Sequence, residues 1–177
     1  NDTSPTFTVS GLVPTDSVYI YFNGADSNKL KADATTESFI GALTTDGSYI
    51  ANVKSRDIAG NLSSASSGLN FRLDTTPFTP TTPPNLLAEF DSGMSSSDDT
   101  TSSRVPQFEV TQLPSISDSL YLYIQSGITN QLVQKTIKSY NITKDTLFVP
   151  DSSELGSGEF TVTYTVLDSA GNVSVPS

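Results

Sequence analysis

The loop from Asp91 to Asp99 has the composition of a cation-binding site. Its first residues, Asp91-Ser92-Gly93, can form a turn that presents a carboxylate and a bare backbone carbonyl, and Asp98 and Asp99 follow in the same loop. Calcium binds about six to eight hard oxygens from carboxylates, carbonyls and water. The spacing is not that of an EF-hand. The residues alone leave two interpretations open: a calcium site, or a solvated acidic loop held by Asx turns.

A second pair of aspartates begins a repeated turn. Asp57–Asn61 and Asp168–Asn172 both read Asp-x-Ala-Gly-Asn. The simplest interpretation is a hairpin turn in which Gly and Asn adopt positive φ and Asp accepts backbone hydrogen bonds. Either carboxylate could also be a ligand of a bound cation.

Enzyme chemistry has few candidate residues. The chain has no Cys, and it has no His, which excludes disulfides, thiolate nucleophiles, Ser-His dyads and zinc sites built on those residues. Asp98/Asp99 and Glu154/Glu159 could be proposed as glycosidase carboxylates. Such sites need a cleft and stacking aromatics, usually Trp, and the chain has no Trp. We therefore expect no enzyme, with no catalytic residue and no organic cofactor.

The charge excludes two classes of partner. There are 19 Asp and Glu against 9 Lys and Arg, a net charge of −10, so the chain should repel nucleic acid and anionic membranes. No apolar stretch is long enough to insert into a membrane. The N-terminus has no leader segment, so we expect a piece of a longer secreted chain, stapled by a hard cation in place of disulfides.

The candidate residues lie in two copies of one module. The segment Asp16–Tyr21 recurs as Asp118–Tyr123, and Asp57–Ser63 recurs as Asp168–Ser174, in the same order. Between the copies, Asp74–Pro77 runs into a segment rich in Pro and Thr, where proline favours a stiff extended path. We predict two domains, 1–76 and 77–177, joined by this short linker.

Within each copy, apolar residues alternate with a period of two, which is typical of half-buried strands. The alternating runs are Phe7/Val9, Val18/Ile20/Phe22, Tyr49/Ala51/Val53, Leu69/Phe71/Leu73, Leu86/Ala88/Phe90, Phe108/Val110, Leu120/Leu122/Ile124, Leu132/Thr136 and Phe160/Val162/Tyr164/Val166. Turn signals such as Asn23-Gly24 and Gly171-Asn172 separate the runs. No segment has a sustained helical period. The pattern predicts an all-β chain of two tandem immunoglobulin-like β-sandwiches.

The second copy begins with residues 85–104, which the first copy lacks, so we expect the first module to be N-terminally incomplete.

The order of these motifs resembles the bacterial Ig-like repeats of giant surface adhesins that type I systems secrete. The resemblance rests on Asp57–Ser63, on Leu73–Pro77, and on Asp91–Gly93 with Asp98 before Pro106–Phe108. It implies an extracellular stalk on the bacterial surface, acting in adhesion and biofilms, whose partners are neighbouring repeats of the same chain. It also implies calcium near the module junctions, which would stiffen the rod. The distal ligand would lie outside these residues.

The resemblance favours calcium at the acidic loop, with Asp91, Gly93, Asp98 and Asp99 as ligands. In a sandwich, the turn before the last strand lies where the chain enters the domain. Asp168 could therefore meet Asp74 and Asp2 across the junction, and Asp57 would occupy the matching turn of the first module. Two departures from the family pattern are Ser103–Val105, in place of Asp-Thr-Thr, and the unusual segment Gln131–Asp151.

Two other functions stay open. One is a ligand-binding module that recognises a glycan or host protein through exposed loops. The other is an accessory domain of a secreted hydrolase. The pairs Tyr19/Tyr21 and Tyr121/Tyr123 could form a binding stripe, although such residues more often make the outer wall of a sheet.

Overall fold

The computed structural model describes residues 4–111, 118–126, 129–136, 144–148 and 154–177. The chain divides into two compact units, Asn1–Thr76 and Pro77–Ser177, here called unit 1 and unit 2. Every regular element in the described residues is a β-strand. Within them there is no helix that is long and apolar enough to cross a membrane.

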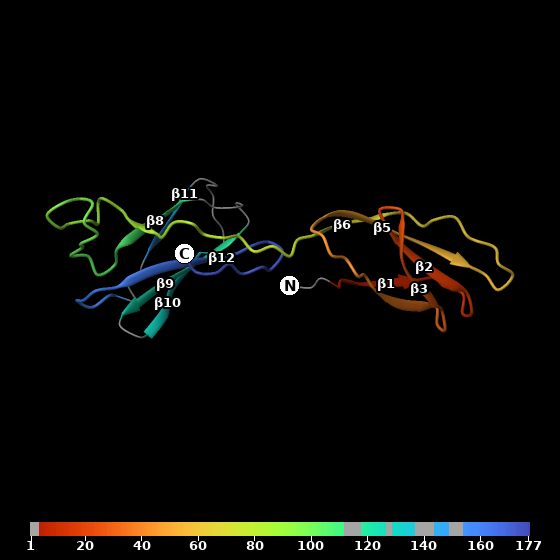
Figure 1. Ribbon diagram of the computed structural model, residues 1–177. Coiled ribbons are helices and arrows are strands. Elements are labelled where there is room, and N and C mark those ends of the chain that lie inside the picture. The colour runs from red at the N-terminus through yellow and green to blue at the C-terminus, as the bar shows by residue number, and fades with distance from the viewer. Residues whose placement is uncertain (1–3, 112–117, 127–128, 137–143, 149–153) are drawn as a thin grey trace. The chain divides into compact units, whose positions relative to one another are not determined.

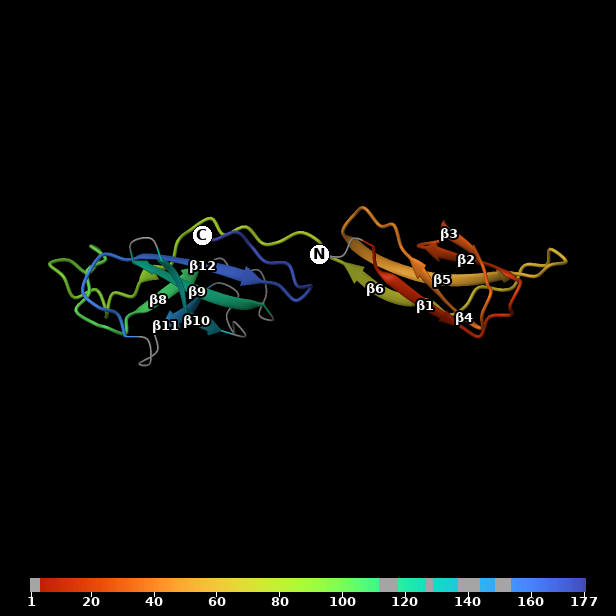
Figure 2. The same ribbon diagram turned by 90° about the horizontal axis from the view of Figure 1, so that it is seen from below.

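Unit 1 contains two antiparallel sheets (Figure 1). One sheet pairs β1 with β4, and the other has the order β3-β2-β5-β6. In Figure 2, β1 and β4 lie on one side of the unit and β2 and β3 on the other. The strand bounds are β1 Thr6–Ser10, β2 Ser17–Phe22, β3 Ala25–Lys31, β4 Thr36–Ile40, β5 Gly47–Arg56 and β6 Leu69–Leu73.

Strand β2 shows how the sequence sets the two faces of a sheet. Val18, Ile20 and Phe22 are buried, while Tyr19 and Tyr21 face outward. The strand ends in the predicted turn, where Asn23 and Gly24 both have positive φ, 51° and 82°. Positive φ at both central residues makes a type I′ turn, whose twist matches that of the flanking strands.

Aromatic rings fill one end of the unit 1 core. The Phe7 ring lies 5.1 Å from the rings of Phe22 and Phe71, and Tyr49 stacks on Phe71 at 5.5 Å between centroids. Such pairs stabilise a core beyond the apolar area that they bury. They hold the two sheets together in a chain that has no disulfide.

Unit 2 repeats this plan with sheets β10-β9-β12 and β11-β8-β7. The strand bounds are β7 Asn85–Leu86, β8 Gln107–Thr111, β9 Ser119–Ser126, β10 Thr129–Thr136, β11 Lys144–Phe148 and β12 Thr161–Leu167. Its core is built from the predicted apolar runs, namely Leu86, Phe108, Val110, Leu120, Leu122, Ile124, Tyr164 and Val166.

One local prediction for unit 2 was wrong. The predicted strand Leu86–Phe90 is only the two residues of β7, because the chain turns at once and the amide of Phe90 donates to the carbonyl of Leu87 at 2.8 Å.

The Pro/Thr-rich segment begins unit 2 and contacts its core. Phe78 packs against the unit 2 core and Pro80 is buried, because an aromatic ring and a proline ring gain more from apolar contact than from water.

The alternation of apolar residues did not predict the polar strands. Alternation did not predict β3, β4 or β11, since their residues are mostly charged or hydroxylated. The run Leu132/Thr136 does fall in β10. Residues 1–3 and much of Gln131–Asp151 lie outside the described residues. Among those described, β1 pairs with β4 alone, whereas β8, its repeat counterpart, pairs with both β11 and β7.

Candidate functional site

The acidic loop after β7 is closed by its own hydrogen bonds. The amides of Ser92 and Gly93 both donate to the carbonyl oxygen of Thr100, at 2.9 and 3.2 Å. The amide of Ser102 donates to the Ser92 hydroxyl oxygen at 2.8 Å. These bonds bring the two ends of the loop together, so its aspartates occupy defined positions.

Asp91 and Asp98 are brought together inside this loop. Asp91 is only 8% exposed, and its Oδ2 accepts a hydrogen bond from the Asp99 amide at 3.2 Å. Its other oxygen, Oδ1, is buried and has no hydrogen-bond partner. Asp98 accepts from the amides of Thr100 and Ser95, at 3.2 and 3.3 Å. The Asp98 carboxyl also contacts the Asp91 carboxyl.

The surroundings keep Asp98 ionised. Desolvation acts to raise the pKa of the Asp98 carboxyl, but the hydrogen bond from the Thr100 amide, the contact with Asp91 and the bond from the Ser95 amide outweigh it. The pKa therefore lies below its ordinary value. Two carboxylates that touch repel each other, and either a shared proton or a bound cation relieves this repulsion.

This donor set suits a hard cation. A buried carboxylate oxygen without a partner costs free energy, and a cation would supply the missing interaction. Gly93 makes the close approach possible, because a Cβ at this position would lie 2.5 Å from Oδ1 of Asp98. No group of three or more acidic residues in the described part of the chain is arranged to hold a metal. Backbone carbonyls and water would therefore complete the shell.

Asp99 contributes its backbone to the closed loop. It adopts a left-handed conformation, with φ of 55°, and is exposed. Its backbone amide, not its carboxylate, is what bonds to Asp91.

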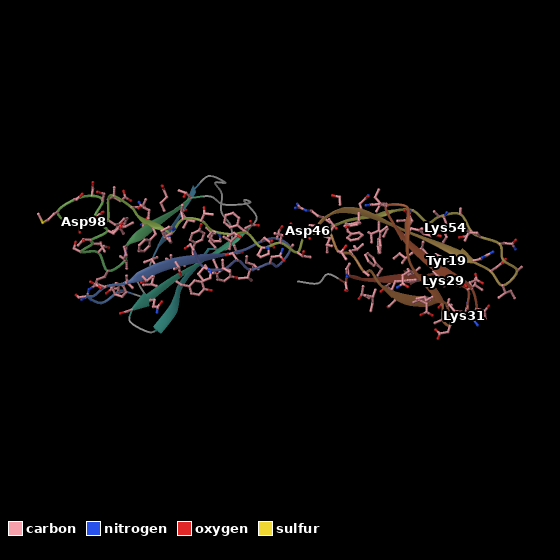
Figure 3. The ribbon with its side chains drawn as sticks, viewed as in Figure 1. Tyr19, Lys29, Lys31, Asp46, Lys54 and Asp98 are labelled. Atoms are coloured by element: carbon pink, nitrogen blue, oxygen red, sulfur yellow. The ribbon has the colours of Figure 1, made fainter. Side chains whose placement is uncertain are left out.

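In Figure 1 this loop (green) and the turn after β12 (blue) lie at opposite ends of unit 2, and Figure 3 labels Asp98 in the loop.

The two Asp-x-Ala-Gly-Asn turns confirm part of the predicted geometry: Gly60 and Gly171 have positive φ, 92° and 91°, whereas the predicted positive φ at Asn61 and Asn172 is wrong. Asp57 accepts from the backbone amide and the side-chain amide of Asn61, both at 2.8 Å. Asp168 accepts from the same two groups of Asn172, at 2.8 and 2.7 Å, and from the amide of Ala170 at 2.9 Å. Hydrogen bonds from Asn61 lower the pKa of Asp57. The turn alone accounts for both aspartates.

Asp74 and Asp168, two of the residues predicted to meet across the junction, belong to different units. Asp74 forms an ion pair with Arg72 at 3.0 Å within unit 1. Asp168 belongs to unit 2. Asp2 lies outside the described residues. A cation shared by these three residues therefore stays a prediction.

Sequence reasoning missed the role of Asp46. Its carboxylate accepts hydrogen bonds from the Thr75 amide and hydroxyl, at 2.9 and 2.7 Å, and from the Thr76 hydroxyl at 2.6 Å. The hydroxyls of Thr76 and Thr75 lower the pKa of Asp46. Asp46 thus fixes the chain just after β6. The signal in the sequence was an Asp-Gly turn before β5 together with Thr75-Thr76 after β6.

Unit 2 also contains an open cavity of about 1110 Å³ beside the end of the acidic loop. Its walls include Phe108, Phe160, Arg104 and Glu159. Glu154, one of the carboxylates considered for glycosidase chemistry, pairs with Arg104 at 3.5 Å.

Comparison with known families decides the fold class. The family model described as bacterial Ig-like domain matches residues 1–75 and again 78–177. The chain belongs to the bacterial Ig-like domain family. The prediction of two tandem Ig-like sandwiches is confirmed, and the acidic loop lies within the second bacterial Ig-like domain. This family is generally non-enzymatic.

Solved structures with similar folds belong to much longer proteins. Dimeric latent PorU from Porphyromonas gingivalis is 15% identical, with a TM-score of 0.37, and the match covers 100% of this chain and 18% of that chain. The BSP domain of a biofilm-associated protein is 12% identical, with a TM-score of 0.32, and the match covers 92% of this chain and 24% of that chain. No curated protein matches the sequence.

Proposed function

We propose that the chain is a stalk segment of a bacterial surface adhesin, in which two Ig-like domains act as spacers for a distal binding domain. The proposal is supported by the tandem match to one structural family over nearly the whole chain. Spacer domains need a folded core and defined ends, and they need no active site. We propose an extracellular location on the same grounds.

We further propose that calcium stiffens this stalk. The single observation that supports it best is the buried Oδ1 of Asp91, which has no hydrogen-bond partner and belongs to a carboxyl that contacts the Asp98 carboxyl. Asp91 and Asp98 would hold the ion, and the absence of a Cβ at Gly93 lets the Asp98 carboxylate come close to the loop backbone. When bound, the ion would supply positive charge to a loop of a chain whose net charge is −10. A second ion, held by Asp74, Asp168 and Asp2, would pin neighbouring domains together.

Calorimetric titration of the demetallated chain with calcium tests the loop site. We expect binding to the wild type, at least a tenfold loss of affinity in Asp91→Asn and Asp98→Asn, and no change in Asp33→Asn, an exposed aspartate of unit 1. Equal affinity in all four proteins would refute the loop site.

Small-angle scattering with calcium and then with chelator tests the stiffening. An unchanged maximum dimension would refute that part of the proposal.

A further inference from the structure

Unit 1 gathers cations on the outer face of one sheet. In β2 the residues facing away from the core include Ser17 and Tyr19. The strand register places Tyr19 opposite Lys29 of β3 and Lys54 of β5. It places Ser17 opposite Lys31 and Arg56 in the same two strands. Since residues directly opposite share a face, four cations flank β2, and Asp26 of β3, opposite Tyr21, lies on the same face. We call the four cations, together with Tyr19 and Tyr21, the basic face.

The basic face holds its charges in a regular array. Alternate residues of a strand lie roughly 7 Å apart, and the two strands on either side of β2 lie roughly 10 Å apart. The ammonium of Lys29 sits over the Tyr19 ring at 5.2 Å, and that of Lys54 over the Tyr21 ring at 5.4 Å. Figure 3 shows Lys29, Lys31, Lys54 and Tyr19 within this part of unit 1. Cation–π contacts of this kind restrain flexible lysine side chains.

These charges are available to a ligand. Lys29, Lys31 and Arg56 are exposed, and Lys54 is half-buried. The ion pairs found in the described residues join Arg72 to Asp74 and Arg104 to Glu154, and neither uses the basic face. The Nε–H of Arg56 donates a hydrogen bond to the carbonyl of Gly60 at 3.0 Å. The two NH₂ groups of its guanidinium can then donate to a ligand.

Unit 2 repeats only part of the basic face. The tyrosines that match Tyr19 and Tyr21 are Tyr121 and Tyr123. Lys135 of β10 lies opposite Tyr121, as Lys29 lies opposite Tyr19, but the partners in β12 are Thr165 and Thr163, which carry no charge. Four of the 9 basic residues in a chain of net charge −10 thus flank the single strand β2. Packing within the sandwich does not need them there, because they point away from the core.

We propose that the basic face binds an acidic polysaccharide. Four cations in a flat array complement an anionic chain that lies across the strands, and the tyrosine hydroxyls add donors for sugar hydroxyls. Single-stranded nucleic acid fits less well, because its binding uses open aromatic faces for base stacking, and here lysine ammoniums lie over the rings. This ligand site goes beyond the spacer function.

The test uses the full chain with polygalacturonate as the acidic probe, dextran as the neutral control and a single-stranded oligodeoxynucleotide as the competing polyanion. We expect binding to polygalacturonate that weakens with salt, no binding to dextran and weaker binding to DNA. The variant Lys29→Gln/Lys31→Gln/Lys54→Gln/Arg56→Gln should lose at least tenfold in affinity, while Arg104→Gln, which removes a cation of unit 2, should not change it.

A second variant guards against misfolding. Lys29→Arg/Lys31→Arg/Lys54→Arg keeps the charge and should keep the binding, and Lys29→Gln/Lys31→Gln alone should lose part of it. No binding of wild type to polygalacturonate, equal binding by the fourfold variant, or tighter binding to DNA would each overturn the proposal. Because the experiment needs no calcium, its failure would leave the stalk proposal unaffected.

Discussion

The hydroxyl oxygen of Ser174 accepts a hydrogen bond from the backbone amide of Val166 at 2.9 Å, and the same hydroxyl donates to the carbonyl of Val175 at 2.7 Å. Ser63 repeats this arrangement in unit 1, where its hydroxyl oxygen accepts from the Ser55 amide at 2.9 Å. In each unit, the hydroxyl of the serine that follows the Asp-x-Ala-Gly-Asn turn takes the place of a backbone carbonyl that continued strand pairing would supply. It thereby accepts a hydrogen bond from a backbone amide of the neighbouring strand.

Ser174→Ala should destabilise unit 2. Ser174 is 6% exposed and Val166 is fully buried, so removing the hydroxyl leaves a buried amide without an acceptor. Such a loss costs about 1–3 kcal/mol. Ser63→Ala is the matched control and should cost less, because Ser63 is exposed and water can replace its hydroxyl. Thermal unfolding of both variants measures the difference. Equal losses would contradict this reading of the two serines.

Asn172→Ala should cost more stability than Asn61→Ala. The two side chains make the same hydrogen bond to the turn aspartate, at 2.7 and 2.8 Å. Asn172, however, is 1% exposed while Asn61 is exposed. A hydrogen bond to a charged group is worth about 1.5–3 kcal/mol when it is shielded from water. Urea unfolding would show this as a lower midpoint for the unit 2 variant. A larger effect at Asn61 would mean that burial does not decide the cost.

Stability of unit 1 should depend on Asp46 only above acid pH. The hydroxyls of Thr76 and Thr75 hold the pKa of Asp46 below its ordinary value of about 3.8. A lowered pKa in the folded state stabilises the fold above the unfolded value of about 3.9, and this contribution disappears as the pH falls through the folded pKa. Asp46→Ala should therefore lower the Tm at pH 6 and have little effect at pH 2. A Tm difference that does not change with pH would argue against ionised Asp46 as the cause.

Gly93→Ala should reduce calcium affinity more than stability. The added Cβ would lie 2.5 Å from Oδ1 and 2.8 Å from Oδ2 of Asp98, so the Asp98 carboxylate must move away from Asp91. The loop is exposed, so the fold should tolerate the shift. If calcium binds as proposed, the wild type gains about 2.7 kcal/mol at 100 times its Kd, and Gly93→Ala should gain less. A full calcium-dependent rise in Tm in the variant would mean that Asp98 is not a ligand. Gly156→Ala, which has open space around its Cβ, is the control.

The sequence by itself determined the parts of the fold that depend on local pattern. Alternation placed Val18, Ile20 and Phe22 on the buried face of β2, because side chains in a strand alternate between its two faces. Asn23-Gly24 determined a hairpin, since those residues accept positive φ at low cost. The repeated motif Asp57–Ser63 and Asp168–Ser174 was sufficient to indicate a tandem Ig-like chain. Polar strands such as β3 gave no such signal, because their position depends on pairing with a neighbour.

Tertiary structure alone decided what each acidic and basic residue does. Asp91, Asp98 and Asp99 look equivalent in the sequence, yet only the first two carboxyls meet, because the turn at Asp99 directs its amide inward. Asn61 and Asn172 share one motif but differ in exposure. The basic face exists only through the register that aligns β3, β2 and β5. The aspartates depend on the backbone path of their loop, and the basic face depends on the pairing of β2 with β5, which lie far apart in the chain. The spacing of residues along the sequence encodes neither.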